Sequence, residues 1–315
     1  MKRIRVKVFF SVLYVLFLLC SGFQNTTAYG QVFKGKIVDE STTESLKYVN
    51  VTVPSLQVGT MSDKNGKFKL DISKVRLNDT IKISHLGYKT VKLSLKDLKA
   101  LESRIVALKQ KVYLLNEIVA VSEGSKSKMI GSLKYNKRKP QKFGLLDISS
   151  GYEFGVCIAN NSPVKIRAVN FLLSKCTYND LLVRMNFYAV EQDPEKDNTY
   201  DQKSKDKKPG AEYIPTDQDL HKLKLKNIAS QPIYMKLSKE ELEGGEVHFD
   251  VAQYNLTCEG SLLIALEFVE DMSEGTFGIW ARNSGQVFYR SVGQENWASF
   301  GMSLCLNAEV VKLKK

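Results

Sequence analysis

The chain has 315 residues and a formal net charge of +12. The part after residue 30 is long enough for two domains, each able to bury its own core. No segment in it is apolar over the roughly 20 residues that a transmembrane helix needs, so the sequence excludes a helical membrane span there.

Residues 1–30 have the pattern of a secretory signal peptide. Four basic residues precede an apolar run of about 13 residues, and the small residues Ala28 and Gly30 stand near the end of the segment. We therefore expect the mature chain to begin at Gln31 and the protein to be exported, to the periplasm, the outer membrane or the outside of the cell. In the alternative reading Cys20 is a lipoprotein cysteine, although Leu19 is larger than the Gly, Ala or Ser that such processing requires.

Residues 31–110 read as a small β domain. Apolar and polar residues alternate in three runs, which is the pattern of strands with one face on a core. Asn65 and Gly66 lie between two of these runs and predict a two-residue hairpin turn. The alternating apolar residues are Val49, Val51 and Val53, then Phe68, Leu70 and Ile72, then Val91, Leu93 and Leu95.

Several short motifs of this segment resemble the carboxypeptidase regulatory-like domain. They are residues 35–39, the step at 59–60, the turn at 63–66 and the pair at 87–88. That domain is a transthyretin-like β-sandwich, common in secreted and outer-membrane proteins of the Bacteroides group. The resemblance implies a β-sandwich over residues 31–110 and a place in the cell envelope.

Residues 115–121 resemble the segment that joins this domain to the plug of TonB-dependent outer-membrane receptors. Such receptors continue into a barrel of about 22 strands, each of about 10 residues, and that barrel alone would exceed the rest of this chain. We therefore expect the resemblance to end at this segment, without receptor function.

Basic side chains are concentrated between residues 102 and 142, which contain ten Lys or Arg and three Glu. Charge blocks of this kind are typical of solvated linkers, and we expect a basic linker over residues 111–143. The alternative is an anion-binding site for lipopolysaccharide, acidic polysaccharide or lipid headgroups. Nucleic acid is not an expected partner of an exported chain. The candidate anion-binding residues are Lys134, Lys137, Arg138, Lys139 and Lys142.

Residues 144–315 read as a second β domain. About eight β-rich runs are separated by Gly, Asn and Asp, without a convincing amphipathic helix, which predicts a jelly-roll-like sandwich. Residues 191–226 interrupt it with a highly charged segment that cannot bury a core, so we expect a mobile insertion. The fold class is therefore all-β, with two successive β-sandwiches.

The sequence lacks the motifs of common catalytic and metal sites. No histidine begins a His-x-x-Glu pair, and neither Cys-x-x-Cys nor His-x-His occurs, so we expect no catalytic residue, metal or cofactor. Carboxylate neighbours such as 217 and 219, 240–241 and 270–271 leave a glycoside hydrolase open, with acids assembled from separate strands of the second domain. Four cysteines allow zero to two disulfides: Cys157, Cys176, Cys258 and Cys305.

Aromatic residues gather near the C-terminus beside arginines. Rings flanked by Arg and Asn suit stacking on sugar faces, and Trp280 alternates away from the apolar face of its run. The alternative is that these rings fill the sandwich core. The candidate ligand-binding residues are Trp280, Arg282, Tyr289, Arg290 and Trp297.

Together these features predict a non-catalytic, exported binding or scaffolding protein of the cell envelope. The expected partner is a polysaccharide or an envelope protein, with an anionic envelope surface as a further candidate. A glycoside hydrolase is the alternative.

Overall fold

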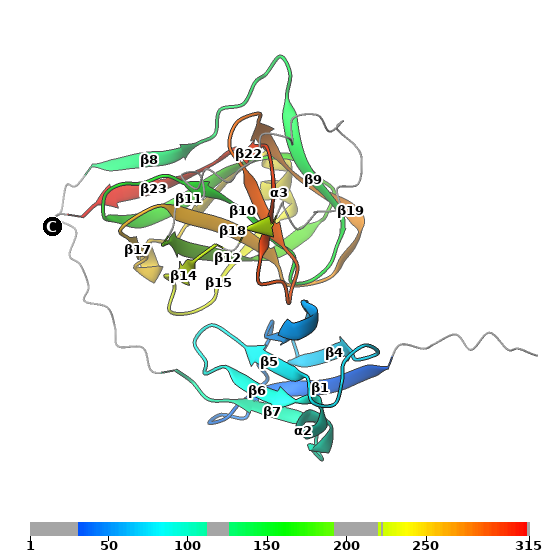
Figure 1. Ribbon diagram of the computed structural model, residues 1–315. Helices are drawn as coiled ribbons and strands as arrows, with labels where there is room; N and C mark the ends of the chain where they lie inside the picture. Colours follow the sequence, from blue (N-terminus) through cyan, green and yellow to red (C-terminus); the bar gives the residue numbers. More distant parts are fainter. Residues whose placement is uncertain (1–30, 112–125, 192–219, 222, 314–315) are drawn as a thin grey trace, which may run out of the picture.

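A computed structural model describes residues 31–111, 126–191, 220–221 and 223–313 of the chain (Figure 1). More than half of these residues are in strands and only short helices occur among them; they form two units, and the fold is all-β. The expected signal peptide at 1–30, the joining segment at 115–121 and most of the expected mobile insertion lie outside the described residues. No helix within the described ranges is long and apolar enough to cross a membrane.

The first unit is a sandwich of a three-stranded and a four-stranded sheet. Its buried side chains come from the alternating positions of the sequence, including Val51, Phe68 and Ile81, which are at most 2% exposed. The three-stranded sheet has the order β4 (Lys67–Asp71), β1 (Val32–Asp39), β7 (Ile105–Leu108). The second has the order β3 (Val58–Met61), β2 (Asn50–Val53), β5 (Thr80–Ser84), β6 (Val91–Ser94), and the helix α2 (Leu95–Ala100) follows.

The tight turn at residues 63–66 is present, but it does not close a hairpin. Asp63 Oδ1 accepts hydrogen bonds from the N–H groups of Asn65 and Lys67, and Gly66 has a φ of 73°. A Cβ at Gly66 would lie 2.6 Å from the carbonyl oxygen of Ile37, so glycine is required there. The predicted hairpin is wrong because β3 and β4, on either side of the turn, belong to opposite sheets.

Two of the motifs that carry the family resemblance meet in space. The Asp39 carboxylate accepts hydrogen bonds from Gln110 Nε2, from Tyr88 Oη and from the N–H groups of Ser41 and Thr42. These hydrogen bonds keep the pKa of Asp39 well below its usual range, and the bond from Gln110 has the largest effect. The carboxylate thus ties the end of β1 to the segments after β5 and β7.

The second unit is a sandwich of two eight-stranded antiparallel sheets. We call them sheet A and sheet B. Sheet A has the order β13 (Leu220–His221), β21 (Trp297–Phe300), β20 (Val287–Arg290), β10 (Glu153–Ile158), β18 (Leu262–Phe268), β12 (Asp180–Val190), β14 (Leu225–Asn227), with β15 (Ile233–Ser238) also on β12. Sheet B has the order β22 (Ser303–Leu304), β19 (Met272–Arg282), β11 (Val164–Cys176), β23 (Leu306–Lys312), β8 (Ser127–Ser132), with β16 (Glu246–Asp250) and β17 (Thr257–Cys258) on β11 and β9 (Gln141–Ile148) on β19.

The chain passes repeatedly between these two sheets. Strands β10, β11 and β12 alternate between sheets A and B, and β18, β19 and β20 do the same, as in a jelly-roll-type sandwich. The helix α3 (Lys239–Gly244) connects β15 to β16. Large side chains from both sheets fill the space between them: Phe154, Phe171, Phe187, Phe268 and Phe277, none of which has any exposed surface.

The prediction of a linker over residues 111–143 is wrong for much of that range. β8 pairs with β23, and β9 pairs with β19, so both strands belong to sheet B. They are held there because Ile130 and Phe143 bury their side chains in the sandwich core. Residues 220–221 and 225–227, placed in the expected insertion, are strands as well; residues 192–219 and 222 lie outside the part that is described.

Within the described residues, the four cysteines of the second unit form no disulfide. Cys258 and Cys305 are buried, whereas Cys157 and Cys176 are partly exposed. Burial raises the pKa of the Cys176, Cys258 and Cys305 thiols, which makes these thiols less reactive. The reading without disulfides therefore holds, and the core itself stabilises this unit.

The first unit covers part of the outer face of sheet A (Figure 1). Tyr48 and Met61 of the first unit form a buried apolar cluster with Val269. The Tyr48 hydroxyl donates to Glu270 over 2.8 Å, and Arg184 Nη1 donates to the carbonyl oxygen of Tyr48 over 3.0 Å. Apolar contact and hydrogen bonds thus join the two units directly.

A buried polar network continues from this contact across sheet A. Glu153 and Glu267 are opposite one another on β10 and β18, and Asn186 Nδ2 donates to both carboxylates at 2.7 Å. Arg184 pairs with Glu267 at 2.8 Å, and Arg290 pairs with Glu153 at 2.7 Å. Each carboxylate is therefore neutralised by its own arginine, which is how two neighbouring charges are tolerated in a buried place.

The side chain of His85 is a half-buried titratable group at the junction of the two units. It directly follows β5, and the next residue, Leu86, packs against the core of the second unit. Burial, and then the positive charge of Arg184, lower the pKa of His85 to about 4. A protonated imidazole therefore destabilises this arrangement.

We expect acid to weaken the folded protein through His85. An unfolded chain protonates histidine near pH 6.5, so stability is complete above that pH and falls by about 3 kcal/mol as the pH decreases to about 4. His85→Phe keeps a ring but cannot titrate, so its melting temperature should decrease less between pH 7 and pH 4. Carboxylates titrate alike in both proteins, and an equal decrease in the two would contradict the assignment.

Candidate functional site

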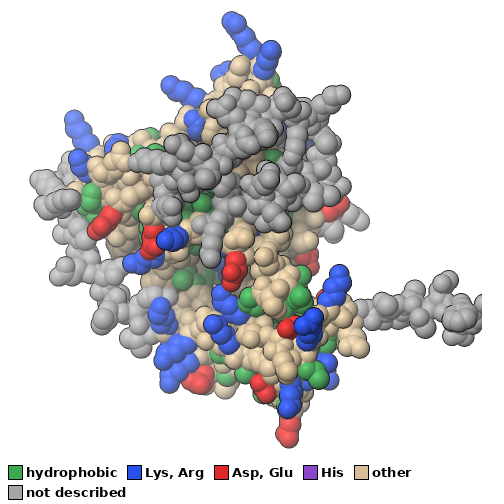
Figure 2. Space-filling view, viewed as in Figure 1, with side chains coloured by type: hydrophobic (Ala, Val, Ile, Leu, Met, Phe, Trp, Pro, Cys, Tyr) green, Lys and Arg blue, Asp and Glu red, His purple; other side chains and the backbone are tan. Residues whose placement is uncertain are grey.

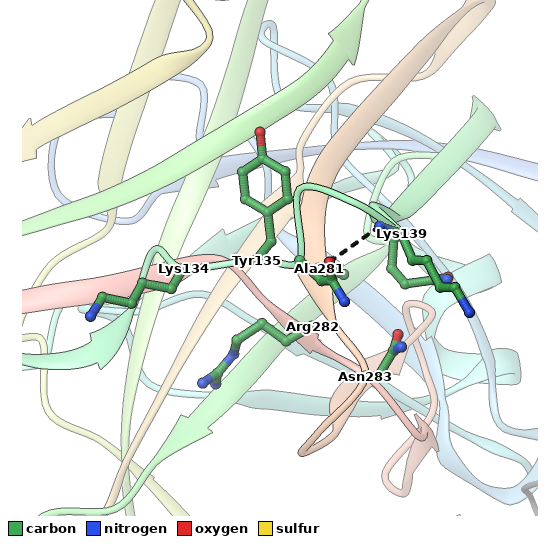
Figure 3. Close-up of a pocket in the computed structure, with 8 residues that line it drawn as sticks. Lys134, Tyr135, Lys139, Ala281, Arg282 and Asn283 are labelled. Atoms are coloured by element: carbon green, nitrogen blue, oxygen red, sulfur yellow. Dashed lines mark hydrogen bonds between the residues drawn. The ribbon is translucent and has the colours of Figure 1, made fainter.

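A pocket of about 260 Å³ lies where the loop between β8 and β9 meets the end of β19 (Figure 3). This volume is slightly smaller than the roughly 300–1,000 Å³ of ordinary small-molecule sites. Amide, cationic and aromatic side chains dominate its lining, and no carboxylate is among them. The lining residues are Lys134, Tyr135, Asn136, Lys139, Gln141, Ala281, Arg282 and Asn283.

Strand β19 presents two of the predicted ligand-binding residues on its outer face. Phe277, Ile279 and Ala281 are buried toward the sandwich core, so the period of two places Trp280 and Arg282 on the opposite face of sheet B. Lys142 of β9 is the register partner of Trp280, and Ser303 is that of Arg282. The aromatic and basic candidates therefore share one surface.

Tyr135 stacks directly on Trp280. Their ring centroids are 4.8 Å apart and their planes are inclined by only 2°. Trp280 is half-buried beneath this stack, so it is neither a freely exposed platform nor a core residue. Tyr135 is among the lining residues of the pocket and Trp280 is not, so the stack places Trp280 next to the pocket through Tyr135.

Local hydrogen bonds define the loop at residues 133–140. The Asn136 side-chain oxygen accepts from the backbone N–H groups of Arg138 at 2.9 Å and Lys139 at 3.2 Å, which closes an Asx turn (Figure 3). The Lys134 N–H donates to Ser132 Oγ at 3.1 Å, and the Lys134 carbonyl oxygen accepts from Cys305 Sγ at 3.6 Å. The loop therefore has a definite shape at both of its ends.

Positive charge surrounds the pocket. Lys134, Lys139 and Arg282 line it. Figure 2 shows Lys and Arg side chains gathered at the tip of the second unit, where Figure 1 places the loop between β8 and β9. Within the described residues none of these three cations forms an ion pair. The pocket is thus a place of attraction for anions.

Seven of the ten candidate residues belong to this region, and three do not. Trp280, Arg282 and the five basic candidates lie on β19, β9 and the intervening loop. Trp297 is 1% exposed in an apolar cluster with Phe288, and Arg290 lies over its ring at 4.3 Å while pairing with Glu153. Tyr289 stacks on Phe300 at 5.0 Å and packs against the sandwich core. Trp297 and Arg290 thus belong to an apolar cluster and an ion pair on the outer face of sheet A, and Tyr289 packs against the sandwich core, so none of the three lines the pocket.

Sequence reasoning missed five of the eight lining residues, namely Ala281 and four with polar or aromatic side chains. Tyr135, Asn136 and Gln141 stand within the basic run, and Asn283 follows β19. A tyrosine beside an Asx-turn residue within a lysine-rich run was the available signal, since a solvated linker has no need of an aromatic ring.

The carboxylates that could serve a hydrolase have structural partners. Glu153 and Glu267 are buried within ion pairs, and Glu241 closes the capping box at the start of α3. Glu270 accepts from Tyr48, and Asp271 accepts from the N–H of Ser150. Residues 217 and 219 lie outside the described ranges, and within those ranges no three His, Cys, Asp or Glu residues are grouped as a metal site would need.

Comparisons with known proteins identify the first unit. Residues 33–120 match the family model of the CarboxypepD_reg-like domain. The TonB-dependent receptor SusC of Bacteroides thetaiotaomicron is 27% identical over 194 residues, which cover 57% of this chain and 18% of the receptor. The chain thus spans less than a fifth of that curated relative's length.

Two solved structures of infectious bursal disease virus were also found. The Gt strain structure has a TM-score of 0.20 at 11% identity, and the VP2 subviral particle has 0.16 at 9% identity; each covers 90% of this chain and 64% of its own. Such low scores carry no argument about fold or function. The Asp39–Tyr88 contact and the two-sheet sandwich lie within the segment that this family model matches, so the first unit is similar to the CarboxypepD_reg-like domain.

Proposed function

We propose that this is a non-catalytic binding protein of the bacterial cell envelope whose ligand is a carbohydrate. The observation that carries the proposal is the pocket of the second unit, which is lined by Tyr135, whose ring stacks on Trp280, together with side-chain amides and cations. An aromatic face binds the apolar face of a sugar, and amides and cations bind its hydroxyl and acidic groups.

The envelope location is the second part of the proposal. It draws on the CarboxypepD_reg-like domain, on the similarity to a TonB-dependent receptor and on the export signal expected at residues 1–30. The first unit is then the part that attaches the carbohydrate-binding sandwich to an envelope protein. An anionic envelope surface is a further partner, and nucleic acid is not one.

A glycoside hydrolase is the competing function, and the pocket argues against it. Hydrolysis of a glycosidic bond needs two carboxyl groups on opposite sides of the bond. No Asp or Glu lines this pocket. Glu153 and Glu267, which face one another on β10 and β18, are buried and are neutralised by Arg290 and Arg184.

The proposal is tested with purified protein on immobilised and soluble glycans. We expect retention of the wild type on at least one polysaccharide without release of reducing ends. Tyr135→Ala should weaken binding at least tenfold because it removes the stacking ring, whereas Tyr135→Phe keeps the ring and should bind nearly as well.

Three results would count against this proposal. Cleavage of the bound glycan would favour the hydrolase. Equal binding by wild type and Tyr135→Ala would move the carbohydrate site away from this pocket, and a blank screen would leave a scaffolding role through protein contacts.

A further inference from the structure

Arg282 is the most constrained cation of the pocket. Its Nη2 donates to Ser303 Oγ over 3.1 Å, which fixes the plane of the guanidinium group. Its Nε is buried and has no hydrogen-bond partner among the described residues. A buried donor without an acceptor costs free energy, so the chain itself leaves the Arg282 guanidinium incompletely hydrogen-bonded.

Two lysines from a different strand connection complete the cationic lining. Lys134 and Lys139 come from the two ends of the loop that Asn136 shapes, and in Figure 3 Lys134 and Arg282 extend in the same direction. Three positive charges around one small pocket, with no carboxylate in its lining, repel one another unless a negative charge lies between them.

We infer that the pocket binds an anionic sugar residue, one that carries a carboxylate or a sulfate group, within a polysaccharide. This inference rests on the carbohydrate-binding function proposed above and specifies its ligand. The planar guanidinium of Arg282 matches two oxygens of a carboxylate or sulfate, Lys134 and Lys139 add charge, and the Tyr135 ring lies against the sugar. The small volume accommodates one such residue of a longer chain.

The test compares pairs of polysaccharides that differ only in charge. The probes are polygalacturonate against its fully methyl-esterified form, and dextran sulfate against dextran. We expect the wild type to bind at least one charged member more than tenfold tighter than its neutral partner, and the difference to shrink at high salt because the Debye length falls.

Variants then assign the effect to Arg282. Arg282→Gln should weaken binding to the charged polysaccharide at least tenfold, and by a clearly larger factor than it weakens binding to the neutral one. Arg282→Lys keeps the charge but lacks the planar guanidinium, so its affinity for the charged polysaccharide should lie between those of the wild type and Arg282→Gln. Arg167→Gln removes the same charge from an exposed arginine of β11 outside the pocket lining and should bind like the wild type. Melting temperatures of all variants show which of them remain folded, and Arg282→Lys serves if Arg282→Gln does not fold.

The outcomes separate this inference from the proposed function. Equal affinity for charged and neutral members would overturn the inference while carbohydrate binding stands. Equal weakening by Arg282→Gln and Arg167→Gln would also overturn it, because the attraction would then be diffuse. Binding to vesicles of phosphatidylglycerol but to no polysaccharide would overturn both the inference and the proposed function.

Discussion

Replacing Arg184 with methionine should lower the free energy of unfolding by about 3–5 kcal/mol, the usual cost of leaving one partner of a buried ion pair unpaired. Arg184 and Glu267 are each 6% exposed in their side chains, so the remaining carboxylate would have no access to water. The substitution also removes the donor to the Tyr48 carbonyl oxygen and with it one link between the two units. Thermal melts should show a decrease on the order of 10 °C.

A double variant separates the charge from the packing. Arg184→Met with Glu267→Leu removes both charges, and we expect it to recover much of the loss because no unpaired charge remains. Asn186 keeps its bond to Glu153 in this variant. A single variant that melts with the wild type, or a double variant less stable than the single one, would contradict this account of the network.

Trp297→Ala should be nearly as damaging, at about 3–5 kcal/mol, because it empties a fully buried site. The ring is 1% exposed and lies under Arg290, which pairs with Glu153. Trp280→Ala serves as the matched control. It removes a half-buried ring from a stack. Loss of the stacking interaction should lower the free energy of unfolding by about 0.5–1.5 kcal/mol, in addition to the smaller burial term of a half-buried ring. The same change should weaken glycan binding because Tyr135 loses its stacking partner.

Stability and binding should therefore depend on different tryptophans. Urea unfolding of the two variants measures the first quantity, and retention on the glycan measures the second. Should Trp297→Ala retain the stability of the wild type and lose the glycan, the ligand surface would lie on sheet A after all.

Period-two alternation was sufficient to predict an all-β fold with two sandwiches. It succeeded because strands such as β4 bury one face and expose the other, with Phe68 and Leu70 inward and Lys67 and Lys69 outward. The same rule places Trp280 on the outer face of β19. These are local properties of the chain, and local spacing reports them well.

The errors arise where a strand's surroundings come from distant segments. β8 is short and mostly exposed, and its partner β23 is far away in the sequence, so a basic linker was the natural interpretation of its residues. Trp297 has polar neighbours in the sequence, a pattern that favours a surface position. Sheet A is covered on its outer face by the first unit at one end and by an apolar cluster with Leu223 and Leu225 at the other, and alternation cannot indicate a second buried face.

The sequence predicts several residues in and around the pocket but not that they come together. The basic residues and Trp280 were each recognised, but their meeting depends on the pairing of Lys142 with Trp280 across β9 and β19. No spacing rule places Tyr135 on Trp280, because that contact joins two strands through a loop whose shape depends on Asn136.

The first unit and the pocket lie on opposite faces of the second unit, which affects how the protein would work in an assembly. The first unit lies on the outer face of sheet A, while Trp280 and Arg282 stand on the outer face of sheet B. Packed sheets are separated by about 10 Å, and side chains and loops add to that thickness on either side. Under the proposed function the second unit would act as a spacer: a ligand in the pocket and a partner bound by the first unit would be held apart on opposite sides, and both could be bound at once without competing for the same surface.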